Sequence, residues 1–314
     1  MLAAHADWSM APGKRWFAWA RPGASGWEIA APEPVGALGT FGARLRGLGA
    51  GPVALGVDLP LGLPRAYVTA HLGEGDFPAF LKQLGDKAEF FAVCETLAEV
   101  GPGRPFYPRR GLAGMRRAAH AAALGVGGPE GLSRLCDRAT AIRPAGAPLF
   151  WTLGANQTGK SAITAWRDWL IPALLAGEDI GLWPFMGDFR ALLDRHALVV
   201  AETYPAEVMR HLGLVMPGSK RRQADRAGLA AALRAAMARL GALPCPALAT
   251  EVADGFGSDA AGEDRFDCVI GLLGVLNVLA GNRPDLVPDD PWLRRWEGWV
   301  LGQTELPGAS NSAT

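Results

Sequence analysis

Two short apolar runs, each ending at an acidic residue, constrain the fold of this chain most. They are residues 52–58 (PVALGVD) and residues 197–202 (ALVVAE). Uninterrupted apolar strands of this length are typical of parallel sheets that are buried on both faces. Parallel neighbours must be joined by long crossovers, which are usually helical. The two runs therefore predict an α/β protein in which helices flank a central sheet.

The start of the chain indicates a different kind of pairing. Residues 2–8, 15–20 and 27–30 are short apolar or aromatic segments separated by turns rich in Gly and Pro, which predicts three antiparallel strands. We expect helices over residues 36–49, 205–212, 222–240 and 264–280, with a mainly helical insertion at about 65–195. The expected fold is a mixed sheet of three antiparallel strands plus parallel strands, in one domain over 1–302 with a flexible tail at 303–314.

Charge and composition exclude several classes of protein. Lys plus Arg and Asp plus Glu both number 31, so no net charge attracts nucleic acid or acidic membranes over long range. No apolar run approaches the roughly 20 residues that span a bilayer, and the N-terminus has no secretory pattern. The four cysteines form no C-x-x-C pair, which argues against zinc and redox motifs. We expect a soluble, cytoplasmic protein with no membrane partner, and leave its oligomeric state open.

Acidic residues stand at the ends of three expected strands: Asp7, Asp58 and Glu202. The carboxyl ends of parallel strands meet at one edge of a sheet, where ligands of α/β proteins bind. Three carboxylates that converge there would repel one another, and Mg²⁺ or Mn²⁺ would relieve that repulsion. Asp264 and Asp267 are three apart and share one face of the last expected helix, so both are further candidate metal ligands. The alternative is that each acid is a cap or turn residue, with Asp264 as a helix N-cap.

Four segments of the chain resemble, in order, the motifs of one family. They are VDLPLGLP (57–64), ETYPAE (202–207), SKRR (219–222) and DRFDCV (264–269). This pattern resembles domain-of-unknown-function family 429, whose members are regarded as predicted nucleases with a ribonuclease H-like fold, and it covers roughly residues 2–302. The resemblance implies that Asp7, Asp58, Glu202 and Asp267 are catalytic, metal-binding acids. One departure is the first strand, which reads Ala-His-Ala-Asp-Trp where the family usually has Gly-Ile-Asp.

A competing motif lies at residues 154–161, where GANQTGKS matches the phosphate-binding pattern G-x-x-x-x-G-K-[ST]. A strand over 149–153 and a helix over 161–175 would give it the usual context, with Lys160 on the phosphates and Ser161 on Mg²⁺. We rank this hypothesis second because residues 104–148 contain no apolar run that could flank the loop as a parallel strand. A glycine-rich helix entry is the simpler interpretation.

Basic residues suggest where a polyanion could bind. Arg109 and Arg110 lie in a stretch without acids that contains two aromatics, so they could follow a nucleic-acid backbone or simply face solvent. Lys220 and Arg221 could neutralise a phosphate near the metals. The function that we expect is metal-dependent phosphodiester hydrolysis, with nucleic acid as a candidate partner. The alternatives are an ATP- or GTP-binding protein using residues 154–161 and a non-catalytic ribonuclease H-like binding protein.

Overall fold

Eight strands form one mixed sheet in the computed structural model, which describes residues 1–111, 115–153 and 158–308. Their order across the sheet is β6-β7-β5-β1-β2-β3-β8, with β4 paired to β2. The strands are β1 (Leu2–Asp7), β2 (Trp16–Gly23), β3 (Gly26–Ile29), β4 (Glu33–Pro34), β5 (Val53–Asp58), β6 (Ile180–Leu182), β7 (Leu198–Glu202) and β8 (Ala242–Pro244).

The pairing confirms an α/β protein with a mixed sheet. β1, β2 and β3 are consecutive antiparallel neighbours, whereas β5 is parallel to both β1 and β7. The register places Asp7 beside Asp58 and Val57 beside Glu202. The five main strands that the sequence predicts are therefore present, and β1, β5 and β7 end at one edge of the sheet.

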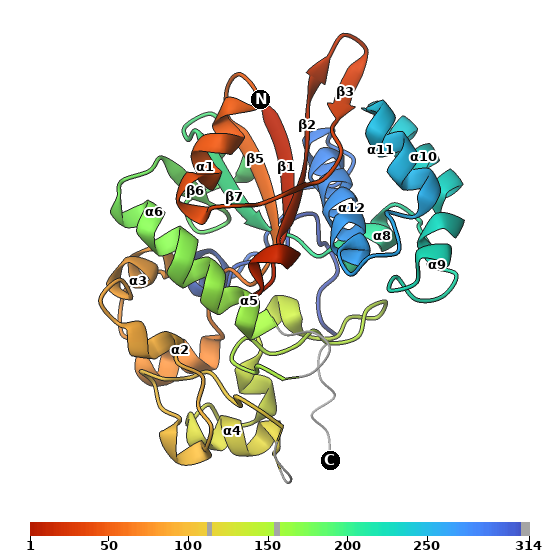
Figure 1. The fold of residues 1–314 in the computed structure, drawn as a ribbon. Coiled ribbons are helices and arrows are strands. Elements are labelled where there is room, and N and C mark those ends of the chain that lie inside the picture. Colours follow the sequence, from red (N-terminus) through yellow and green to blue (C-terminus); the bar gives the residue numbers. More distant parts are fainter. Residues whose placement is uncertain (112–114, 154–157, 309–314) are drawn as a thin grey trace.

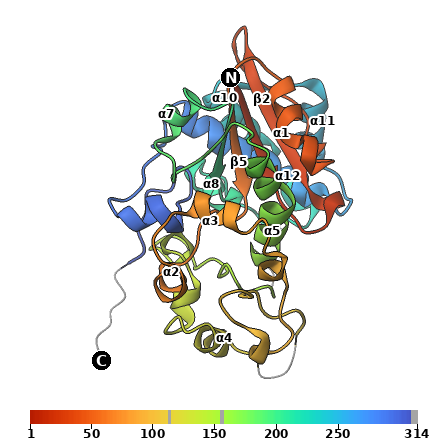
Figure 2. The same ribbon diagram turned by 90° about the vertical axis from the view of Figure 1, so that its left-hand side faces the viewer.

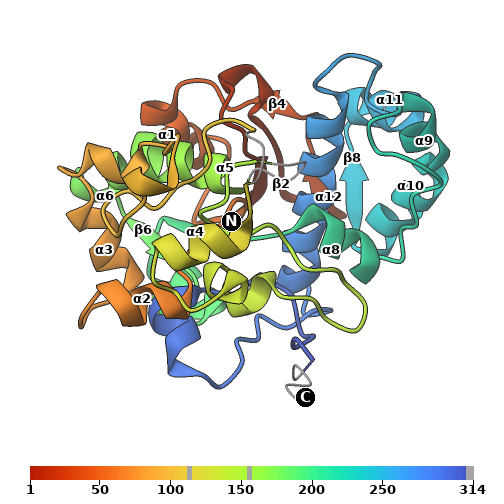
Figure 3. The ribbon, with the colours of Figure 1, turned by 90° about the horizontal axis from the view of Figure 1, so that it is seen from below.

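Helices cover both faces of this sheet, as Figures 1 and 3 show. The long, almost wholly buried helix α12 packs across β1, β2 and β5 on one face. On the other face, Leu2, Ala4 and Ala6 of β1 join the core formed with α1, α5 and α6. The α-helices are α1 (Leu38–Gly47), α2 (Arg65–His71), α3 (Phe77–Gln83), α4 (Arg117–Ala123), α5 (Thr158–Ala165), α6 (Ile171–Leu175), α7 (Phe189–Leu193), α8 (Pro205–His211), α9 (Gln223–Gly228), α10 (Ala230–Arg239), α11 (Pro246–Asp254) and α12 (Gly262–Leu279).

The segment between β5 and β7 is mainly helical, as expected, but it also contributes β6, which pairs in parallel with β7. The three residues of β6, IGL, are too short an apolar run to be recognised as a strand within a mainly helical stretch of sequence.

In Figure 1 the chain enters β1 at the top, so the carboxyl ends of β1, β5 and β7 point down toward α2 and α4, and Figure 2 agrees. The remaining helical segments are short. The 3-10 helices are η1 (Pro12–Lys14), η2 (Ala88–Phe91), η3 (Leu97–Glu99), η4 (Pro129–Leu132) and η5 (Leu135–Asp137), and the π-helical segments are η6 (Trp166–Leu170) and η7 (Leu293–Glu297).

Two boundaries differ from the sequence predictions. The helix expected over 222–240 divides at Leu229 into α9 and α10. The expected flexible tail does not begin at residue 303, because Gln303 is fully buried and its carbonyl accepts a hydrogen bond from the Trp299 indole. Residues 309–314 of that tail lie outside the described residues. Within the described part of the chain, no helix combines the length and apolar character needed to cross a bilayer.

Candidate metal centre

Asp7 and Asp58 lie side by side where β1 and β5 end. They are register partners in a parallel pair, and side chains alternate along each strand, so both project to the face that α12 covers. Asp267, on the second turn of α12, adds a third carboxylate, and its negative charge raises the pKa of both neighbours. The structure therefore places three of the five candidate metal ligands, Asp7, Asp58 and Asp267, near enough for their charges to interact, but their carboxylate oxygens do not all lie within 4.8 Å of one another.

These carboxylates lie in an environment that disfavours their charge. Burial raises the pKa of Asp7 well above its usual range, and the charges of Asp267 and Asp58 raise it further. Burial raises the pKa of Asp58 to about 7, again with Asp267 adding to the shift. Among the described residues, neither Asp7 nor Asp58 has a hydrogen-bond or ion-pair partner for its carboxylate. Two adjacent acids without partners are the arrangement that a cation would stabilise.

A lysine supplies positive charge inside this group. Lys220 donates a hydrogen bond to Oδ2 of Asp267, and its Nζ lies 3.3 Å from Oε1 of Glu263. Burial lowers the pKa of Lys220, but the charge and hydrogen bond of Asp267 outweigh that effect and raise the pKa above its ordinary value. Arg221, predicted with it as a phosphate ligand, is mostly exposed, with Nε 4.0 Å from Glu263.

Asp264 lies on the first turn of α12, beside this group. It is not the N-cap of the helix, because the helix begins at Gly262 and its N-cap is Ala261. Its Oδ2 is buried and has no hydrogen-bond partner among the described residues. Burial raises the pKa of Asp264 to about 6, with Lys14 acting in the opposite direction and Asp267 in the same one. Asp264 is therefore a half-buried fourth carboxylate whose charge interacts with that of Asp267.

Glu202 does not join the other acids, contrary to the sequence prediction. The register pairs it with Val57, not with Asp58, so its side chain leaves the sheet on the opposite face. There its carboxylate is fully buried and accepts two hydrogen bonds from Arg134, both of 2.6 Å. The backbone N–H of Leu61 donates a third, of 2.7 Å. Both oxygens of Glu202 therefore have protein partners.

Arg134 is a buried structural residue that no sequence motif indicated. Its guanidinium is fully buried and also donates to Asp137, at 2.9 and 3.0 Å. Tyr204 donates to the same aspartate at 2.7 Å. Arg143 forms a buried ion pair with Glu207, with Nε 3.4 Å from Oε2, but donates its hydrogen bonds to backbone carbonyls instead. The segment ETYPAE (202–207) thus anchors the insertion to β7, and this buried contact explains the motif without a metal.

His5 occupies a notch that brings α12 close to β1. It is fully buried, its two ring nitrogens have no partner among the described residues, and burial lowers its pKa to about 3. Gly271 makes room for the ring, since a Cβ built there would lie 2.2 Å from Nε2 of His5. Asp7 follows His5 by two residues on β1, and Asp267 precedes Gly271 by four on α12. The contact between His5 and Gly271 therefore sets how closely Asp7 of β1 and Asp267 of α12 can approach each other.

The phosphate-binding motif lacks the context that its chemistry requires. Residues 154–157 lie outside the described residues. The strand expected over 149–153 is wrong, because that segment forms only an isolated bridge between Tyr107 and Trp151 and joins no sheet. Lys160 and Ser161 lie in α5, where the Ser161 hydroxyl donates to the Trp8 carbonyl at 3.0 Å. The helix expected over 161–175 is confirmed as α5, η6 and α6 in succession.

The other charged candidates lie outside the carboxylate group. Arg109 and Arg110 are exposed and face Glu95, at 3.4 and 3.7 Å. Cys136, Asp137 and Glu202 are close enough together to hold an ion, but the Arg134 guanidinium already bonds to both carboxylates. The separate trio of Glu207, His211 and Glu305 also lies beside arginines, at Arg143, Arg210 and Arg283.

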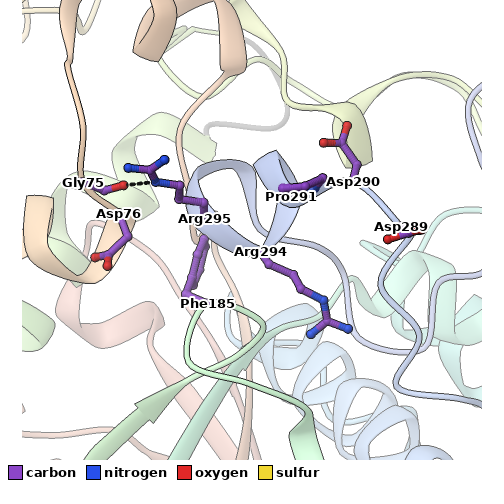
Figure 4. Close-up of a pocket in the computed structure, with 8 residues that line it drawn as sticks. All are labelled: Gly75, Asp76, Phe185, Asp289, Asp290, Pro291, Arg294 and Arg295. Carbon is purple, nitrogen blue, oxygen red and sulfur yellow. Dashed lines mark hydrogen bonds between the residues drawn. The ribbon is translucent and has the colours of Figure 1, made fainter.

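A pocket of about 520 Å³ has none of these acids in its lining (Figure 4). Several of its polar groups already have partners. Arg295 donates to the Gly75 carbonyl within the pocket, while Arg294 pairs with Asp188 and Asp290 with Arg65 outside it. The lining residues are Gly75, Asp76, Phe185, Asp289, Asp290, Pro291, Arg294 and Arg295. None of them belongs to the carboxylate group, so this pocket adds nothing to the candidate centre.

The fold and the site define an α/β protein with a carboxylate cluster at the carboxyl edge of its parallel strands. Comparison with family models, curated proteins and solved structures finds no match to this chain. The carboxylate cluster is defined here as Asp7, Asp58, Asp267 and Asp264, with Lys220 beside them.

Proposed function

We propose that this chain is a metal-dependent nuclease with a ribonuclease H-like fold. The observation that carries the proposal is the pair Asp7 and Asp58, which lie side by side without partners at the ligand-binding edge of an α/β sheet. The order of β3-β2-β1-β5-β7, with antiparallel strands first and parallel strands after, supports the ribonuclease H-like assignment. So does the final helix α12, which contributes Asp267.

The donor set fits a hard divalent cation. All four candidate ligands are carboxylates, and the buried, unpartnered Oδ2 of Asp264 adds an oxygen that a cation would satisfy. Oxygen ligands of this kind suit Mg²⁺ or Mn²⁺ better than softer metals. Asp7, Asp58 and Asp267 would hold such an ion at the sheet edge. When bound, it would supply a lowered pKa for an attacking water and charge stabilisation for a phosphoryl oxygen.

The protein's own groups would hold and orient the substrate. Lys220 is placed to donate to a phosphate oxygen from within the cluster, and Arg221 offers a second, more exposed positive charge beside it. Arg134 and Glu202, on the opposite face, would hold the insertion in place and take no part in the chemistry. Nucleic acid is the substrate class that we propose, since Lys220 and Arg221 could hold a phosphodiester beside a metal-activated water.

The test is Mn²⁺ binding together with hydrolysis. We expect the wild-type chain to bind Mn²⁺ in calorimetric titration and to cleave single-stranded or double-stranded DNA or RNA in Mn²⁺ but not in chelator. Asp58→Asn should abolish both. Asp194→Asn, which changes an exposed aspartate at the C-terminal cap of α7 without altering the cluster, is the matched control and should change neither. Equal Mn²⁺ affinity in wild type and Asp58→Asn would contradict the proposal.

A further inference from the structure

A second pocket, of about 380 Å³, lies among the C-terminal ends of α8, α10 and α12. These helices belong to one hydrophobic core on the same face of the sheet, and Figure 3 shows them together. The volume is in the range of sites that bind small organic molecules. No residue of the carboxylate cluster lines this three-helix pocket. Its lining residues are His211, Leu212, Ala236, Arg239, Leu240, Asn277 and Asn282.

Asn277 is the residue of this pocket that points to a ligand. It is only 6% exposed, and the other buried residues of α12, apart from Asp267, are apolar or glycine. Its carboxamide makes no hydrogen bond to the described residues, yet neither polar atom is sealed from the pocket. An unpaired carboxamide at this depth destabilises the fold, because the hydrogen bonds that it loses to water are not replaced. A ligand in the three-helix pocket would supply the missing partner.

The other polar groups of the lining are hydrogen-bond donors, and one of them is a cation. Arg239 donates to the Leu212 carbonyl at 3.0 Å, which fixes its guanidinium at the pocket and leaves other N–H groups for a ligand. Nε2 of His211 lies 3.1 Å from a guanidinium nitrogen of Arg283. A guanidinium can only donate, so Nε2 accepts and the neutral imidazole carries its proton on Nδ1. His211 therefore offers a second donor.

No acidic side chain lines the pocket to balance this charge. Glu207 and Glu305 lie beside His211, but each is paired with an arginine, at 3.3 and 3.9 Å. Arg239, in contrast, pairs with none of the described acids. The pocket therefore favours a negatively charged ligand.

The remaining lining is apolar and buried. Leu212 and Leu240 are less than a tenth exposed, and Ala236 is fully buried. Bare phosphate or another small inorganic anion would leave this surface uncovered, whereas an apolar group attached to the anion would cover it and gain free energy from its burial.

We propose that the three-helix pocket binds a small organic anion, a carboxylate or phosphate monoester with a compact apolar body. Arg239 and Nδ1 of His211 donate to the charged group, the Asn277 carboxamide bonds to a polar atom of the ligand, and the apolar lining covers its body. This site is separate from the carboxylate cluster, so the inference does not depend on the proposed nuclease function.

The experiment is a ligand-observed NMR titration of the full chain in metal-free buffer. The probes are phenyl phosphate, benzoate, benzyl alcohol, which has the ring but no charge, and inorganic phosphate, which has the charge but no ring. We expect phenyl phosphate or benzoate to bind saturably, about tenfold or more tightly than benzyl alcohol and inorganic phosphate. The tighter of the two ring anions identifies the charged group as phosphate or carboxylate.

Variants locate the bound probe. Arg239→Met and Asn277→Leu should each weaken its binding about tenfold or more. Arg234→Met removes an exposed arginine of the same helix that does not line the pocket, and should leave binding unchanged. Asn277→Leu should also raise the melting temperature of the ligand-free chain, because an apolar side chain of similar size replaces an unpaired carboxamide. It therefore keeps the test decisive even if Arg239→Met fails to fold.

Two results would overturn the inference. One is the absence of saturable binding of either ring anion to the wild-type chain. The other is binding that persists unchanged in a folded Arg239→Met or Asn277→Leu chain, because the anion would then bind elsewhere. Mn²⁺ binding and hydrolysis at the carboxylate cluster should be the same in all these variants, so this inference and the proposed function can fail independently.

Discussion

Replacing Asp58 with asparagine should stabilise the metal-free protein above neutral pH. Burial first, and then Asp267, raise the pKa of Asp58 from an ordinary 3.8 to about 7, while Lys220 opposes them. Between these two values the folded chain holds a proton that the unfolded chain releases, so stability falls as the pH rises through that interval. At about 1.36 kcal/mol for each pKa unit, the full difference in pKa between the folded and unfolded chain corresponds to about 4 kcal/mol of stability. Partial exposure and coupling to Asp7 reduce this, and we expect about 2 kcal/mol.

The assay is urea denaturation of both chains in chelator at pH 4, 6 and 8. The free energy of unfolding should differ little at pH 4, and the advantage of Asp58→Asn should grow to its full size above pH 7. Added Mn²⁺ should reverse the order, because only the wild-type chain gains stability from binding the ion. Glu202→Gln is the contrasting variant and should destabilise the protein, since it weakens a buried ion pair. An Asp58→Asn chain that is less stable than wild type at pH 8 in chelator would refute the reasoning.

Three further outcomes follow from the contacts. Arg134→Met leaves two buried carboxylates without their cation and should lower the free energy of unfolding by about 3–5 kcal/mol in urea denaturation, with partial recovery when Glu202→Gln is added. Gly271→Ala would force a Cβ to within 2.2 Å of His5, so calorimetry should show weaker Mn²⁺ binding as α12 moves from β1, and His5→Ala in the same chain should restore it. Lys160→Ala should leave Mn²⁺ binding and hydrolysis within a few-fold of wild type, and ATP titration should show no saturable binding to either chain. Saturable ATP binding to the wild-type chain that is lost in Lys160→Ala would favour the nucleotide hypothesis.

The sequence predicts the strands well because their apolar character is local information. The runs ending at Asp58 and Glu202 need burial on both faces, and the structure places them as adjacent parallel strands. The pairing register between two strands, in contrast, is not determined by the sequence of either strand alone. A shift of one residue between β5 and β7 decides which face an end residue occupies, and no pattern within either strand encodes that shift. Asp7 and Asp58 share a face and Glu202 does not, so the sequence could place all three at one edge but not in one cluster.

The partner of Glu202 cannot be predicted from the sequence for a related reason. Arg134 belongs to a loop 68 residues away, and one arginine among many in the chain carries no signal of its own. What the sequence did contain was the buried acid itself. A glutamate at the end of a wholly apolar strand binds a metal, pairs with an arginine or keeps its proton, because an isolated buried charge is too costly. These outcomes have the same sequence pattern and differ only in the tertiary contacts.

Two neighbouring strands in the centre of the sheet, β5 and β7, are far apart in the sequence and are therefore synthesised at different times. β1, β2, β3 and β5 are complete once residue 58 has been made, but β7, the parallel partner of β5, ends only at residue 202. Until then the outer edge of β5, an apolar strand, has backbone groups without a partner and is open to pairing with other chains. Closing that edge requires a long loop to order first, which slows folding. The nascent chain is therefore expected to need protection from aggregation during that interval, and the insertion is expected to complete its folding late.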